Sequence, residues 1–66
     1  MLNDQFPSPD LIGEYRQFGE MGPAYKIVRP VRRVDKDDWV LLIEVLETGE
    51  ETEYRFSKVK NDPKVH

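Results

Sequence analysis

The sequence contains no cysteine, and its only histidine is His66, at the C-terminal end. A structural zinc site needs several Cys or His ligands in a tetrahedral arrangement, so this composition excludes one. The absence of cysteine also excludes disulfide bonds, and it fits a cytoplasmic protein, because thiols and disulfides are kept reduced there. We therefore expect a cytoplasmic chain whose fold depends on an apolar core, with or without help from a partner.

Long apolar runs are also missing. No segment approaches the roughly 20 apolar residues of a membrane span, and the N-terminus lacks the basic and apolar regions of a signal peptide. The 66 residues form one small domain, 1–66, with no membrane contact expected. Because a domain of this size buries only about 60% of the surface of its unfolded chain, we expect a protein partner or self-association.

Catalytic signatures are absent as well. The serines have only His66 as a possible base, and a chain terminus does not hold such a base in geometry. The spacing of the glycines matches neither a dinucleotide fingerprint nor a phosphate loop. Asp35–Asp38 begins like a calcium loop, but Val40 and Leu46 stand where Gly and Glu are needed. We predict a protein that is not an enzyme and has no cofactor, metal or catalytic residue.

A β-hairpin is the strongest positive signal, over residues 39–58. Its first strand is apolar on both faces, with Trp39, Leu41, Ile43 and Val45 on one and Val40, Leu42 and Leu46 on the other. A strand buried on both sides belongs in the middle of a sheet or inside a curled barrel. Thr48-Gly49 predicts the turn, with a positive φ at Gly49.

The register of this hairpin has two possible forms. A two-residue turn places Ile43 opposite Tyr54, and a three-residue loop with a glycine bulge places Leu42 opposite Tyr54. The sequence permits both.

The segments on either side of the hairpin are predicted with different degrees of regularity. Residues 1–10 read as an irregular arm, and residues 11–18 as a strand or, with Ser8 as cap and Pro9 as first residue, as a short helix. Residues 24–34 form a strand that lies at an edge or bends at Pro30. After the hairpin, Ser57 is expected to cap one helical turn that packs Val59 on the core, and residues 60–66 are expected to be a frayed tail.

Charge is divided along the chain. The basic strand at 24–34 contains no acid, and residues 39–53 contain five glutamates and no base. We interpret most of this as cross-strand pairing. The basic strand is nevertheless the predicted partner-binding surface, for an acidic protein or, alternatively, for single-stranded nucleic acid, although the pI near 5.0 is low for the latter. Its residues are Tyr25, Lys26, Arg29, Arg32 and Arg33.

Two stretches carry a family resemblance. They are Leu11–Gly19 leading into Gly22-Pro23-Ala24-Tyr25, and Leu46-Glu47-Thr48-Gly49-Glu50-Glu51 leading into Glu53-Tyr54-Arg55-Phe56-Ser57. Together they resemble a family of very short bacterial proteins classed as a domain of unknown function. The resemblance implies no activity, cofactor or site. Short proteins of this type are often encoded beside a partner, as in toxin–antitoxin loci, so it suggests an antitoxin-like accessory role.

We therefore predict a mainly β fold, an antiparallel meander of about four strands that curls toward a small SH3-like barrel. The alternative is an α+β fold with a short N-terminal helix on a three-stranded antiparallel sheet. The predicted function is non-catalytic protein binding.

Overall fold

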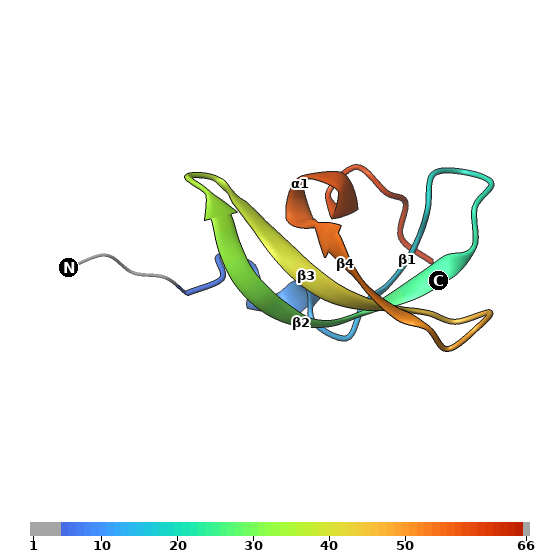
Figure 1. Cartoon of the computed structure of the whole chain (residues 1–66). Coiled ribbons are helices and arrows are strands. Elements are labelled where there is room, and N and C mark those ends of the chain that lie inside the picture. Colours follow the sequence, from blue (N-terminus) through green and yellow to red (C-terminus); the bar gives the residue numbers. More distant parts are fainter. Residues whose placement is uncertain (1–4, 66) are drawn as a thin grey trace.

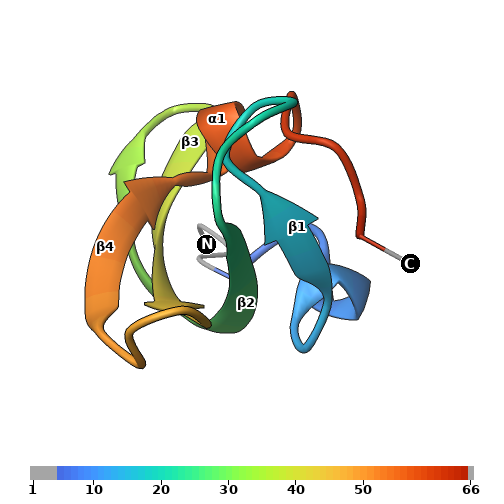
Figure 2. The same ribbon diagram turned by 90° about the vertical axis from the view of Figure 1, so that its right-hand side faces the viewer.

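Four antiparallel strands follow one another in a meander of order β1-β2-β3-β4, and a single helical turn follows the last strand (Figure 1). The computed structural model describes residues 5–65. Its elements are η1 (Pro9–Leu11, a 3-10 turn), β1 (Tyr15–Gln17), β2 (Ala24–Asp35), β3 (Asp38–Val45), β4 (Glu51–Arg55) and α1 (Phe56–Val59). The predicted mainly β meander is confirmed. The sheet curls but does not close, since β1 and β4, at the two ends of the strand order, do not pair with each other (Figure 2).

The curl arises in the long β2–β3 hairpin. Pairing with β3 skips Val28, Val31 and Val34, so β2 carries an extra residue at each of these three points. Each such bulge bends the strand and increases its twist. Pro30 lies between the first two bulges, in agreement with the predicted bend.

The core fills the concave side of the curled sheet. Leu41 and Ile43 of β3 are fully buried there, as predicted for their face, and Val40 on the opposite face is only 6% exposed. The remaining core side chains come from β2 and α1: Tyr25, Ile27, Phe56 and Val59. Val59 therefore packs on the core, as expected from a helical turn after β4. No helix in the described part is long and apolar enough to cross a membrane.

The register of the β3–β4 hairpin differs from both predictions. Leu41, and not Ile43 or Leu42, lies opposite Tyr54. The connection contains four residues, Leu46–Gly49, because the amide groups of Thr48 and Gly49 both donate to the Val45 carbonyl oxygen before Glu50 resumes the pairing. Gly49 has the predicted positive φ, at 74°.

The helical and extended signals near the N-terminus are both realised, one after the other. Ser8 precedes η1 and Pro9 is its first residue, but the turn ends after Leu11 and Gly13 adopts a φ of 93°. The predicted strand over 11–18 is therefore confined to Tyr15–Gln17. Of the expected irregular arm 1–10, only residues 5–10 are described, and residues 1–4 lie outside the described part.

The C-terminal segment is held against β1 instead of being frayed over 60–66. The Gln17 amide donates to the Pro63 carbonyl, the Val65 amide donates to the Tyr15 carbonyl, and Arg16 and Lys64 form an isolated β-bridge. Residues 63–65 thus cover the outer edge of β1, which the sequence pattern did not indicate because Pro63 lacks a donor and its carbonyl does the pairing. Residue 66 lies outside the described part.

Candidate functional site

The five predicted partner-binding residues do not form one surface. Tyr25 is fully buried, and its hydroxyl donates to the Asp62 carboxylate at 2.7 Å. Its side chain is a core residue, which the pattern could not distinguish from an exposed aromatic on the basic strand. Lys26 lies where β2 is paired on both sides, opposite Tyr15 and Glu44. Tyr25 therefore does not lie beside the arginines, whereas Lys26, opposite Glu44, is the same-face neighbour of Arg29, opposite Leu42.

The three arginines all lie in the outer half of β2, residues 28–35, and all are exposed. Residues directly opposite in an antiparallel pair share a face of the sheet. Arg29 and Arg32 lie opposite Leu42 and Val40 and so share the convex face, whereas Arg33 lies opposite Trp39 on the concave face. The bulge at Val31 places Arg29 and Arg32, three residues apart, on the same face, while Arg32 and Arg33 alternate as adjacent strand residues do.

The convex-face arginines differ in their contacts. Arg32 forms an exposed ion pair with Glu53 of β4 at 3.2 Å, which confirms the expected pairing of basic and acidic strands at this point. The side chain of Arg29 makes no hydrogen bond or ion pair with the residues that the structure describes. An exposed ion pair of this kind contributes at most about 1 kcal/mol. Arg32 can therefore exchange Glu53 for a carboxylate of a partner at little cost.

On the concave face, Arg33 borders an open hollow of about 510 Å³. We call this site the hollow and define it by its lining residues: Gln5, Pro7, Ser8, Arg33, Lys36, Asp37, Trp39, Phe56 and Lys60. These residues come from the N-terminal arm, the β2–β3 turn and α1. They are brought together because α1 packs against β3. The sequence predicted that a helical turn packs Val59 on the core and singled out Arg33 by its charge, but it did not predict the hollow.

The aromatic side of the hollow is rigidly packed. The Phe6 ring contacts the Trp39 ring at a centroid distance of 5.6 Å and the Phe56 ring at 4.9 Å, both edge to face. The Lys60 ammonium lies 4.9 Å from the centre of the Phe56 ring, a cation–π contact. These contacts anchor the N-terminal arm on the core through Phe6.

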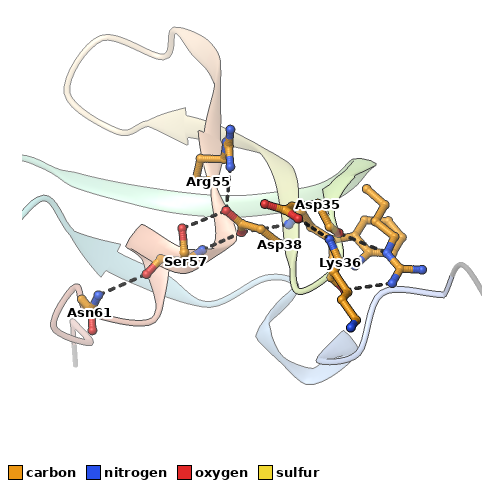
Figure 3. A network of polar contacts seen from close by, with 8 residues as sticks. Asp35, Lys36, Asp38, Arg55, Ser57 and Asn61 are labelled. Carbon is orange, nitrogen blue, oxygen red and sulfur yellow. Dashed lines mark hydrogen bonds and ion pairs between the residues drawn. The ribbon is translucent and has the colours of Figure 1, made fainter.

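Asp38, at the start of β3, connects this strand to α1 and to Arg55 (Figure 3). One carboxylate oxygen accepts the amides of Trp39 (2.8 Å) and Ser57 (3.0 Å), and the other accepts the Arg55 guanidinium (2.8 Å) and the Ser57 hydroxyl (2.9 Å). The predicted capping role of Ser57 is wrong, because its hydroxyl donates to Asp38 and the Asp38 carboxylate accepts the amide of the first turn. Asp38 thus serves as the cap from a distant strand.

The four donors determine the charge state of Asp38. Partial burial opposes ionisation, but the hydrogen bonds from Arg55, Ser57 and Trp39 outweigh it and lower the Asp38 pKa to about 2. The carboxylate is therefore ionised and fully engaged at neutral pH. It does not compete for the lysines of the hollow.

A second polar cluster lies on the other side of the core. The hydroxyls of Tyr25 and Tyr54 donate to the same Asp62 oxygen at 2.7 and 3.1 Å, and the Gly19 amide donates to the other oxygen at 3.2 Å. Burial and the Asp62 charge raise the pKa of both tyrosines, so they stay protonated donors. All three donors are satisfied inside the fold, so the cluster has a structural role.

The Asp38 and Asp62 carboxylates are both engaged by donors within the fold. No three His, Cys, Asp or Glu side chains within residues 5–65 are arranged to hold a metal ion. Asp38 is the acid nearest to Ser57, and it is fully bonded. The hollow and the outer half of β2 together provide cations, aromatic surface and a strand edge.

Comparison with known proteins identifies the family of the chain. No curated protein matches the sequence. The resemblance to a short domain of unknown function is confirmed over nearly the whole length. Residues 3–66 match a family of unknown function, DUF5397, and the chain belongs to this family.

Proposed function

We propose that this chain is a non-catalytic accessory protein that binds another protein through the outer half of β2. The observation that carries the proposal is the length difference between neighbouring strands. β1 pairs only with Ala24–Lys26, whereas β2 continues to Asp35, so no described strand covers the outer edge of residues 28–35. Such an edge presents amide and carbonyl groups that a partner strand can bind.

Side chains along this edge favour an acidic partner. The guanidinium groups of Arg29 and Arg32 project from the convex face and suit bidentate contacts with carboxylates. The three bulges and Pro30 disturb the regular spacing of the edge, which disfavours indiscriminate pairing of identical copies. The edge is therefore suited to a partner whose backbone follows the same bends.

We propose that the protein acts in the cytoplasm, as an antitoxin-like partner of a neighbouring gene product. Two considerations support this setting: the chain has no cysteine, and it resembles short proteins that are encoded beside a partner. Co-expression with the products of adjacent genes tests this role directly. Growth inhibition by one such product, relieved by this chain, is the expected result.

A tagged pull-down tests the binding surface. Wild-type protein is compared with a variant carrying Arg29→Ser, Arg32→Ser and Arg33→Ser, with and without nuclease. A stoichiometric protein that resists nuclease and is lost with the triple variant is the expected result. The matched control, Lys58→Ser with Lys64→Ser, removes cations that line neither the edge nor the hollow and should leave capture unchanged. Capture that survives the triple substitution contradicts the proposal.

Single-stranded nucleic acid is the second candidate ligand. The feature that favours it is the grouping of Trp39 and Phe56 with Arg33, Lys36 and Lys60, since such sites combine cations with aromatic rings on which bases stack. Against it, Tyr25 is buried and so cannot stack a base. Nucleic-acid binding predicts a steep, log-linear loss of affinity with salt and loss of captured proteins on nuclease treatment.

A further inference from the structure

The hollow adds a chemical requirement to the partner, and this inference rests on the proposed protein-binding function. We propose that the hollow receives an acidic segment of the partner that carries an apolar side chain. The apolar side chain packs against Trp39 and Phe56, and the flanking carboxylates bind the cations at the rim. The segment continues onto the outer edge of β2, which no described strand covers, since Arg33 belongs both to that edge and to the hollow.

Size and packing of the hollow favour one inserted side chain. A volume of about 510 Å³ falls within the usual range of ligand sites, roughly 300–1,000 Å³. The aromatic side is already ordered by the contacts of Phe6 with Trp39 and Phe56, so an entering side chain does not have to immobilise it. A preformed site loses less entropy on binding than a mobile one.

The charge of the hollow specifies the flanking groups. Among the described residues that line it, three are cations, Arg33, Lys36 and Lys60, and one is an acid, Asp37. Asp38 lies close by, but its carboxylate is engaged by Arg55, Ser57 and Trp39. The hollow is thus locally positive in a chain whose net charge is −3.

Three glutamates lie at the other end of the sheet. Glu47, Glu50 and Glu51 lie in and after the β3–β4 connection, and the length of β3 separates them from the β2–β3 turn (Figure 1). An acidic ligand is therefore attracted to the hollow and repelled from the opposite end. This separation of charge orients the approaching partner and favours its binding at the hollow.

A peptide fits the hollow better than a nucleic acid does. Base stacking needs an open ring face, and Trp39 is partly buried and is contacted edge to face by Phe6. The neighbouring β2 edge supplies alternating amide and carbonyl groups, which match the backbone of an extended peptide. These observations select the acidic peptide.

The experiment uses Trp39 as its probe, because it is the only tryptophan in the chain. The full-length protein is titrated with the Trp-free peptide Glu-Glu-Leu-Glu-Glu-Leu while the emission of Trp39 is followed. Two matched peptides replace every Glu by Lys or every Leu by Ser. We expect a saturable change in Trp39 emission with the first peptide and a much weaker change with both matched peptides.

Two double variants locate the binding. The double variant Lys36→Ser with Lys60→Ser should bind the acidic peptide about tenfold or more weakly, since it lacks two charge-assisted contacts. The double variant Lys58→Ser with Lys64→Ser should bind this peptide with nearly unchanged affinity. Circular dichroism verifies that both double variants are folded. Equal affinity for the acidic and basic peptides, equal loss in both variants, or tighter binding of oligothymidylate overturns the proposal.

The pull-down separates this inference from the proposed function. If capture of the partner requires Arg29 and Arg32 but is unchanged by Lys36→Ser with Lys60→Ser, the edge binds the partner and the hollow does not. If capture is indifferent to all of these substitutions, the proposed function itself fails.

Discussion

At the scale of single residues, Asp38 joins a strand, a turn and a helix through four hydrogen bonds to one carboxylate. Asp38→Asn keeps the shape but removes the negative charge that these donors favour. We expect it to lower the free energy of unfolding by about 1–3 kcal/mol at pH 7, the cost of losing hydrogen bonds to a charged group. Urea unfolding followed by Trp39 emission measures this. Asp37→Asn, in the same turn, is the control and should have little effect.

The effect of Asp38→Asn should also depend on pH. The Asp38 pKa is about 2 in the folded protein, below the ordinary value of 3.8 for the unfolded chain. The stabilisation by the charged form is therefore complete above pH 4 and disappears as the pH falls toward 2. The difference between wild type and variant should shrink over this interval. A difference that stays constant from pH 7 to pH 2 would show that the charge is not responsible.

Asp62 has a comparable role for two tyrosines. Asp62→Ala leaves the hydroxyls of Tyr25 and Tyr54 without their acceptor, and Tyr25 is fully buried. A buried polar group without a partner costs about 1–3 kcal/mol, so we expect a loss of this size in the free energy of unfolding. Chemical denaturation measures it. The variant Asp10→Ala, at an exposed acid in η1, serves as a control that should unfold like the wild type.

At the scale of elements, the β3–β4 connection depends on the backbone of Gly49. Its φ of 74° lies in the left-handed region, while an added Cβ would meet no atom within 4 Å. Gly49→Val should therefore destabilise through backbone strain alone, by about 1–2 kcal/mol. Gly49→Asn should cost less, because Asn tolerates this region. Equal losses in urea unfolding of the two variants would contradict a strain mechanism.

The same hairpin shows what the sequence reveals and what it does not. The apolar run predicted that β3 is buried on both faces, and Leu41 and Ile43 on one face and Val40 on the other are indeed buried. The register was missed, because the loop length depends on two amides competing for the Val45 carbonyl and not on the Thr48-Gly49 pair alone. The same limit applies to Tyr25, whose burial depends on Asp62, a residue remote in sequence. Arg33 was identified by its charge, but the rest of the hollow arises from tertiary contacts of Phe6 and α1.

At the scale of the whole molecule, one core connects two ends of different character. The hollow and Trp39 lie at the β2–β3 turn, and the Asp62 cluster lies where the C-terminal segment meets β1. Tyr25, Ile27, Leu41 and Ile43 are fully buried between them. Phe6, near the N-terminus, and Val59, near the C-terminus, pack in the same core. Because each end relies on shared buried side chains, we expect neither end to be stable without the other.

Cooperative unfolding tests this dependence. The Trp39 emission reports on the hollow, and the NMR signal of the Gly19 amide, which donates to Asp62, reports on the opposite cluster. In urea both signals should give the same midpoint, as expected for a small two-state domain. Asp62→Ala should lower the midpoint at Trp39 as much as at Gly19, and Phe6→Ala, which removes ring contacts with Trp39 and Phe56, should do the same from the other end. If each substitution shifts only the nearer probe, the two ends unfold separately, and the end that contains the hollow is an independent unit and not part of one cooperative fold.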